Sequence, residues 1–526
     1  MDFSGYLNPL SIIAATSAIS YWAGSKLTKK SDIKMSQKNA SSSLEVPQYF
    51  KDNKYPAKRH NERVAELFVK SCDKDNVAFL VPGESMELRK YCDTVKPFRQ
   101  DRYYYYLSGC DIPGSFIVYN IEQSKLSLFL PDIDKEDIMW SGMPLSLQEA
   151  KEKYDVDDVY YVSDFHNMVT DPKNSLFKID HFYSTDKEYC ETILKQGMQC
   201  LREKIIFGDH VFFKSLDSCR LIKDEYEIET LRHVARITDI NHMAVMSALP
   251  IENNECQIQA EFQYHSMRQG AKALGYDPIC CSGPACGTLH YIKNDQSIEK
   301  KHSVLIDAAS EWNNYTTDVT RCFPIDGKFT KEHREIYETV LDMQSTTMKL
   351  MKPGASWDDL HLLSHKILIE HLLKLGIFKN TYSVEQILKS RVSCAFYPHG
   401  LGHLMGLDVH DVGGEPNYED PDDLFKYLRL RIPLQAGMVI TNEPGCYFNR
   451  FLIDEYINKY PERIAMVDFD VLEKYMYIGG VRIEDDVLVT KDGYENLTGV
   501  TSDPDEIEKI VSEGLKRKRT DFHALV

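Results

Sequence analysis

Apolar and polar positions alternate differently in the two halves of the chain. From about residue 46 to residue 215, apolar runs of four or five residues are separated by polar, turn-rich or helical stretches. Runs of this length, bounded by turn residues, are typical of strands. They occur at residues 77–81, 116–119, 126–130 and 159–162. The pattern predicts a mixed α/β domain over residues 45–215.

An aromatic run, Tyr103 to Tyr106, precedes Leu107, Ser108 and Gly109 in this first domain. Aromatic side chains are enriched in strands, where they pack on a pleated surface. The run therefore predicts a strand with two packed faces, with a binding role as the alternative.

A second unit follows over residues 216–526 and mixes longer helical patterns with apolar strands. Its first helix is indicated by the acidic Asp224 and Glu225, which precede apolar positions at helical spacing. Further helices are expected at 332–352 and 356–376. Strands are expected at 303–308, 437–443 and 479–489. The expected fold class is α/β (α+β).

The first 44 residues differ from both units. Residues 3–25 carry no charge and are mostly apolar, while Lys26, Lys29 and Lys30 follow them. A positive flank after an apolar segment favours a cytosolic side for the rest of the chain. The segment predicts an anchor with a cytosol-facing body, with a mitochondrial leader or a dispensable surface segment as alternatives. Residues 31–44 are rich in serine and predict a linker.

Charge and cysteine content restrict the partners. The chain has 526 residues with 62 basic and 80 acidic side chains, a net charge of −18. This balance argues against a nucleic-acid partner. Thirteen cysteines without regular paired spacing favour a reducing compartment over a disulfide framework.

Candidate chemistry begins with two aspartates. Asp307 ends an apolar run, and Asp318 follows eleven residues later. An aspartate is unfavourable to bury unless it is paired or bound to a metal. The spacing predicts two neighbouring strands joined by a turn, with both carboxylates directed at one point. Turn or capping roles remain the alternative.

Three histidines lie close together further along the chain, at His399, His403 and His410. Gly400 and Gly402 separate the first two, and glycine weakens a helix by roughly 1 kcal/mol per residue. A helical zinc motif is therefore not supported, and a loop entering a strand is expected. Histidines held by core hydrogen bonds are the alternative.

Two glutamates complete the set, because Glu443 and Glu484 each stand beside an apolar run. With Asp307 and Asp318 they total four negative charges, which two divalent ions would neutralise. Oxygen donors with one imidazole suit Mn²⁺ first, with Co²⁺ or Zn²⁺ as alternatives. A two-metal site can activate water and polarise a carbonyl, so hydrolysis is expected.

The order of these five residues resembles the metal set of the pita-bread metallopeptidases. The stretch PHGLGHLMGLDVHDVGG, residues 398–414, is similar to prolidase and aminopeptidase P. Residues 99–115, RQDRYYYYLSGCDIPGS, resemble the domain that precedes the catalytic one in that group. The resemblance implies an N-terminal mixed α/β domain followed by a pita-bread catalytic domain.

The resemblance also implies ligand roles. Asp307 would chelate one metal, and His403 and Glu443 would hold the other. Asp318 and Glu484 would bridge the two ions, and Glu443 would take a proton during catalysis.

Further residues match family positions around the substrate. His290, His399 and His410 would hold the substrate or stabilise an oxyanion, with His399 and His410 in catalytic roles. Arg482 matches an arginine near the bridging glutamate, and Arg429 matches the prolidase arginine that binds the terminal carboxylate of the substrate. A surface role is the alternative for Arg429.

The resulting expectation is two-metal hydrolysis of Xaa-Pro bonds by an Xaa-Pro dipeptidase. An Xaa-Pro aminopeptidase acting on longer peptides is the alternative, and a non-catalytic binding protein on the same fold is a remote one. Small proline-containing peptides are the expected partners. The resemblance further implies a homodimer.

Overall fold

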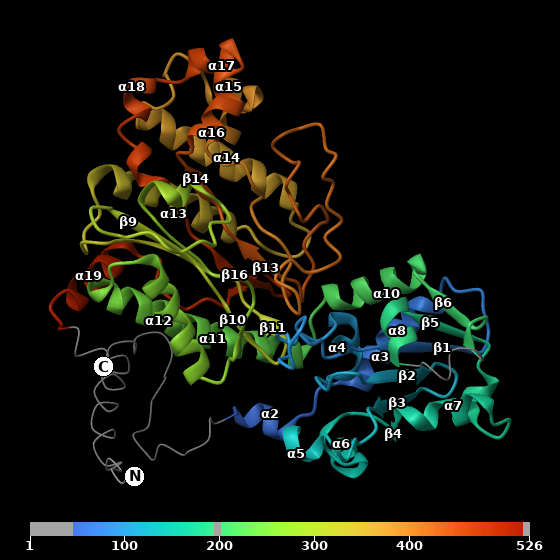
Figure 1. The fold of residues 1–526 in the computed structure, drawn as a ribbon. Coiled ribbons are helices and arrows are strands. Elements are labelled where there is room, and N and C mark those ends of the chain that lie inside the picture. Colours follow the sequence, from blue (N-terminus) through green and yellow to red (C-terminus); the bar gives the residue numbers. More distant parts are fainter. Residues whose placement is uncertain (1–45, 194–200, 519–526) are drawn as a thin grey trace, which may run out of the picture.

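A computed structural model describes residues 46–193 and 201–518 of the chain. Figure 1 shows two bodies: a smaller one built around strands β1 to β6, and a larger one that holds the rest of the chain. The predicted anchor over residues 3–25 lies outside the described residues. Within the described ranges, no helix combines the length and the apolar character that a membrane span requires.

The smaller body is a mixed α/β domain, as the apolar runs predict. Its six strands pair in the order β4-β3-β2-β1-β5-β6, antiparallel among β1, β2 and β3 and parallel elsewhere. The strands are β1 Val77–Pro82, β2 Phe116–Asn120, β3 Lys125–Leu130, β4 Asp158–Tyr161, β5 His181–Ser184 and β6 Ile205–Phe207. The helices are α2 Gln48–Asp52, α3 Ala57–Phe68, α4 Arg102–Ser108, α5 Ile138–Ser141, α6 Leu147–Lys153, α7 Val162–Thr170, α8 Lys187–Ile193 and α10 His210–Leu221.

The aromatic run at 103–106 forms helix α4, so the predicted strand is wrong. The Asp101 side chain accepts a hydrogen bond from the Tyr104 amide at the start of α4, and Gly109 ends the helix with a φ of 63°. A capping aspartate and a left-handed glycine are strong helix boundaries. In this short segment they outweigh the strand preference of the tyrosines.

The larger body combines long helices with several small sheets (Figure 1). Its helices are α11 Glu225–Ala248, α12 Glu255–Arg268, α13 Lys331–Met348, α14 Trp357–Lys374, α15 Val384–Ser390, α16 Arg450–Ile453, α17 Pro461–Met466, α18 Phe469–Leu472 and α19 Pro504–Gly514. Its strands are β7 Ala273–Leu274, β8 Ile279–Ser282, β9 Ser303–Asp307, β10 Ser310–Trp312, β11 Tyr315–Thr316, β12 Thr320–Pro324, β13 Val439–Asn442, β14 Gly445–Tyr447, β15 Gly480–Arg482, β16 Asp485–Val489 and β17 Tyr494–Asn496. The three predicted helices are confirmed as α11, α13 and α14.

The strand predictions in this body hold with one refinement. The apolar runs at 303–308 and 437–443 form β9 and β13, whereas 479–489 divides into β15 and β16. Glu484 lies between the two, where it forms an isolated bridge with Thr320 of β12. β15 then pairs with β14, and β16 pairs with β13, so the break joins two sheets.

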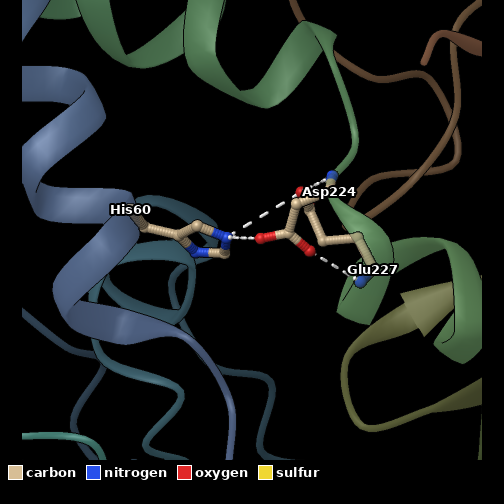
Figure 2. Close-up of side chains that lie close together, drawn as sticks. All are labelled: His60, Asp224 and Glu227. Atoms are coloured by element: carbon tan, nitrogen blue, oxygen red, sulfur yellow. Dashed lines mark hydrogen bonds and ion pairs between the residues drawn. The ribbon is translucent and has the colours of Figure 1, made fainter.

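The two bodies meet at a buried histidine. Figure 2 shows His60 of α3 directed at Asp224, which caps the N-terminus of α11. His60 Nε2 lies 2.7 Å from the Asp224 carboxylate, and Nδ1 lies 2.7 Å from the carbonyl oxygen of Tyr106. Both ring nitrogens therefore have a hydrogen-bond partner, one from each body. Asp224 thus caps a helix and also holds the buried His60 ring.

Replacing Asp224 by alanine should therefore destabilise the chain more than loss of a cap alone. We expect a loss of about 3 kcal/mol, because the buried His60 ring loses a hydrogen-bond partner as well. Asp503→Ala is the matched control, since Asp503 caps α19 through the amides of Asp505 and Glu506. Its expected loss is about 1 kcal/mol. Urea denaturation measures both, and equal losses would contradict the role given to His60.

Candidate metal centre

All ten predicted site residues line a single cavity of about 570 Å³ in the larger body. They are Asp307, Asp318, His403, Glu443 and Glu484 of the expected metal set, together with His290, His399, His410, Arg429 and Arg482. Residues up to 194 positions apart in the sequence therefore meet in one place.

The two aspartates are delivered by neighbouring strands. β9 and β12 pair antiparallel, with Asp307 opposite Thr320. Asp318 stands two residues before β12, and its amide donates to both carboxylate oxygens of Asp486 at 3.2 Å. Both aspartates therefore lie at the same end of two neighbouring strands, as predicted, but the hairpin of β10 and β11 joins these strands in place of the expected turn.

Between His399 and Asp411 the backbone forms neither a helix nor a regular strand. The strand expected after this loop does not form here, and the loop instead makes one isolated β-bridge, between Leu404 and Ile440 of β13. Gly402 explains why this loop can approach β13 so closely, because an added Cβ would lie 2.1 Å from the carbonyl oxygen of Thr441. The absence of a side chain here brings the next residue, His403, against the strand.

His403 has one ring nitrogen occupied by the backbone. Its Nδ1 lies 3.0 Å from the carbonyl oxygen of Leu404, so Nδ1 donates there and Nε2 faces the cavity. That Nε2 lies 3.3 Å from Asp318 Oδ2 and 3.6 Å from Glu443 Oε1. Ligand atoms of Asp318, His403 and Glu484 all lie within 4.8 Å of one another. Three such groups so close together could hold a divalent cation between them.

The Arg482 side chain holds Asp307 in place. Arg482 donates from Nη2 to Asp307 at 2.5 Å, from Nε to the Thr320 hydroxyl at 2.9 Å, and from Nη1 to the Tyr447 hydroxyl at 3.1 Å. The guanidinium is nearly fully buried, with a side-chain exposure of 5%. Its contacts are those of a group that orients ligands.

Tyr276 joins the two aspartates. Its hydroxyl contacts Asp307 and also lies 2.6 Å from Asp318 Oδ1. Burial, and then these two carboxylates, raise the pKa of Tyr276 well above 10, so the hydroxyl stays protonated. A single proton is shared between two carboxylates that would otherwise repel each other.

The electrostatics of the cavity match a cation site. Burial raises the pKa of Glu443 to about 7, although His403 and Arg482 oppose the shift. Burial and the neighbouring carboxylates also raise the pKa of Glu484 well above its usual range. When all four are ionised, as metal binding requires, the carboxylates carry four negative charges, and Arg482 supplies one positive charge. The oxygen-rich donor set therefore fits two divalent ions, which would supply the missing charge.

The three remaining histidines differ in their partners. His399 Nδ1 donates to the Gly400 carbonyl at 2.8 Å, and Nε2 lies 2.8 Å from the Tyr447 hydroxyl. Among the described residues, no group forms a hydrogen bond with the rings of His290 or His410. Burial lowers the pKa of His410 to about 3, so its ring is neutral near pH 7 and is available to a ligand in the cavity.

Three further residues hydrogen-bond to the predicted site residues, and the sequence pattern did not indicate their role: Tyr276, Tyr447 and Thr320. Thr320 donates to Glu484 Oε2 at 2.6 Å, and Tyr447 connects Arg482 with His399. A tyrosine or threonine beside a motif carries no charge pattern that would mark it. The nearest signal is position, because Thr320 and Tyr447 stand two and four residues after Asp318 and Glu443.

Tyr276→Phe removes the hydroxyl between Asp307 and Asp318 and keeps the ring. We expect affinity for Mn²⁺ to fall about 10–100-fold, as for other losses of a ligand-orienting partner. Isothermal titration calorimetry measures the affinity. The control is Tyr337→Phe, which removes a buried hydroxyl that donates to Ser502 outside the cavity. Unchanged Mn²⁺ affinity in Tyr276→Phe would contradict the orienting role.

Comparisons with known proteins match this geometry. Residues 229–491 match metallopeptidase family M24, and residues 59–182 match the aminopeptidase P N-terminal domain. An uncharacterized peptidase of Saccharomyces cerevisiae is 59% identical over 92% of this chain and 89% of its own length. A probable Xaa-Pro aminopeptidase of Fusarium vanettenii is 44% identical over 87% of this chain and 97% of its own length.

Solved structures agree with the sequence relatives. Escherichia coli aminopeptidase P with the inhibitor Pro-Leu has a TM-score of 0.71 and 29% identity, covering 88% of this chain and 99% of that one. Proline aminopeptidase P II from Yersinia pestis has a TM-score of 0.70 and 28% identity, covering 86% and 99%. The predicted N-terminal domain and pita-bread catalytic domain are confirmed. The chain therefore belongs to metallopeptidase family M24, as a metal-dependent peptidase with an aminopeptidase P N-terminal domain.

Proposed function

We propose that the chain is an Xaa-Pro aminopeptidase, which removes the first residue from peptides with proline in second position. The observation that carries hydrolysis is the convergence of five potential metal ligands on one cavity, with His403 Nε2 close to two of the carboxylates. The names of the relatives support an aminopeptidase. The dipeptidase that the sequence put first becomes the second candidate.

Proline selectivity has a physical basis in the substrate. An Xaa-Pro bond is a tertiary amide with no N–H and a rigid ring. Ordinary peptidases that use this N–H lose a contact, whereas a compact cavity gains from the rigidity of the ring. Two bound divalent ions would supply an activated water and polarise the scissile carbonyl.

The residues of the chain would divide the remaining tasks. Glu443 is placed beside His403 and His399, where its carboxylate can accept a proton and return it. His290 and His410, whose rings form no hydrogen bond with other described residues, can hold the peptide or an oxyanion. A fixed donor to an oxyanion is worth about 3–4 kcal/mol in the transition state.

Arg429 is the observation that favours the dipeptidase. It lines the cavity together with His290 and His410, and its one hydrogen bond to another described side chain is from Nη1 to the Tyr418 hydroxyl at 3.2 Å. A guanidinium can bind a carboxylate in a bidentate manner. In a dipeptide that carboxylate directly follows proline, whereas a longer peptide presents an amide there.

A peptide panel separates the candidates. With Mn²⁺ supplied, we expect kcat/KM for Ala-Pro-Ala to exceed that for Ala-Pro by about tenfold or more, a difference of about 1.4 kcal/mol. Ala-Ala-Ala controls for proline selectivity. A preference for Ala-Pro would establish the dipeptidase instead. Metal binding without turnover of any Xaa-Pro peptide would favour a non-catalytic binding protein.

Arg429→Ala tests the carboxylate contact. We expect turnover of Ala-Pro to fall about 10–100-fold, because a charge-assisted contact is lost, while turnover of Ala-Pro-Ala changes less than about threefold. Lys426→Ala is the control, since Lys426 lies in the same loop and does not line the cavity. Equal losses on both peptides would exclude this role for Arg429.

The cellular setting stays a prediction. We propose that residues 3–25 anchor a cytosol-facing enzyme, with a mitochondrial leader as the alternative, and that the chain forms a homodimer. Carbonate extraction of membranes tests the anchor, because complete release of the intact chain into the soluble fraction would contradict it.

A further inference from the structure

A group of buried ion pairs lies where the two bodies join, here called the junction ion network. Its cations are Arg102 of α4, Arg220 at the end of α10, and Lys223 in the connector to α11. Its anions are Glu311 of β10, with Asp408 and Asp411 of the segment from His399 to Asp411, here called the histidine loop. The cations thus come from the N-terminal domain and the connector, and the anions from the catalytic domain.

The contacts are short and concentrated on the histidine loop. Arg220 Nη2 lies 2.7 Å from Asp408 Oδ2 and 2.7 Å from Asp411 Oδ1. Lys223 Nζ lies 2.9 Å from the other oxygen of Asp411. Arg102 approaches Asp408 at 3.7 Å from Nε. The side chains of Arg220, Lys223 and Asp411 are at most 2% exposed.

The aromatic run of α4 also supports this network. The Arg220 guanidinium lies 4.9 Å from the centre of the Tyr103 ring, and the Tyr103 hydroxyl donates to Asp217 at 2.8 Å. A guanidinium over an aromatic face is attracted by the ring quadrupole. Tyr103 therefore restricts where the Arg220 charge can lie.

Asp411 in turn fixes the backbone of the histidine loop. Its amide donates to the Leu404 carbonyl at 2.9 Å, and its Oδ1 accepts from the Val412 amide at 2.9 Å. Gly406 leaves room for these charges, because an added Cβ would lie 2.6 Å from Asp411 Oδ2 and 2.8 Å from Lys223 Cε. The loop is folded tightly around its anions.

His410 lies between the two aspartates in sequence and faces the cavity. Its ring contacts that of His403 edge to face, with centroids 4.4 Å apart. Within the described residues it forms no hydrogen bond of its own. The ring is therefore held by its packing against His403 and by the backbone that carries it, and Asp408 and Asp411 flank it in that backbone.

We infer that the junction ion network positions His410 for catalysis, so that the connector and N-terminal domain act on the reaction through Arg220, Lys223 and Asp411. The inference rests on the proposed function, because it needs His410 to contact the substrate. Buried ion pairs contribute little net stability compared with apolar side chains of the same size. Their contribution here is the placement of one loop.

A double-mutant cycle tests the inference with Ala-Pro-Ala and Mn²⁺. Asp411→Asn keeps the shape of the side chain and removes its charge, and we expect kcat to fall about 10–100-fold with KM within about threefold. In the His410→Ala background, the same substitution should change kcat less than about threefold, because the residue it positions is gone. Additive losses, or wild-type kcat in Asp411→Asn, would overturn the inference.

Rescue and a matched control separate positioning from general loosening. Arg220→Met should lower kcat as Asp411→Asn does, whereas Arg220→Lys should recover part of it, because one nitrogen contacts both carboxylates. His60→Gln perturbs another buried contact of the junction and should lower the melting temperature while leaving kcat within about twofold. An equal loss of kcat in His60→Gln would overturn the inference.

If Asp411→Asn does not fold, Asp408→Asn takes its place in the cycle under the same criteria. The Asp408 side chain is 32% exposed, so its substitution disturbs the folded structure less. If His410→Ala keeps the wild-type rate, the role of His410 fails, and the inference fails with it. Turnover of Ala-Pro-Ala by the unmodified chain tests the proposed function separately.

Discussion

Mutual repulsion among four buried carboxylates is the constraint on which the catalytic domain depends. Asp318, Glu443 and Glu484 lie around His403, Asp307 lines the same cavity, and the buried Arg482 contacts the carboxylates of Asp307 and Glu484 directly. Such a cluster is unfavourable unless positive charge is added. Tyr276 and Thr320 donate hydrogen bonds to these carboxylates but add no positive charge. The arrangement of the strands and loops therefore favours the binding of cations at this site.

Much of this could be predicted from sequence because the candidate metal ligands carry their own signals. An acidic residue at the end of an apolar strand is unusual enough to stand out, and Asp307 ends β9 while Glu443 directly follows β13. The histidine loop was also recognised, because Gly400 and Gly402 argue against a helix. Tyr276 could not be found in this way, since a neutral hydroxyl acquires its role only when the fold brings it between two carboxylates.

In helix α4 the residues at the two ends outweigh the strand propensity of the residues between them. Four consecutive tyrosines favour a strand by propensity, yet Asp101 and Gly109 set the ends of a helix. In that helix, Tyr103 packs against Arg220, and Tyr106 stacks on His60 with ring centroids 4.1 Å apart. The run is therefore explained by the domain junction, which a sequence read one element at a time does not reveal.

The wide separation of the candidate metal ligands along the chain has a consequence for biosynthesis. The sheet that ends in Asp307 is complete by residue 324, but β13 pairs with β16, which begins at residue 485. Contacts of such long range form late, and a growing chain folds its N-terminal domain first. A ribosome must therefore release nearly the whole polypeptide before hydrolytic chemistry exists. The nascent enzyme is inert toward neighbouring peptides for most of its synthesis.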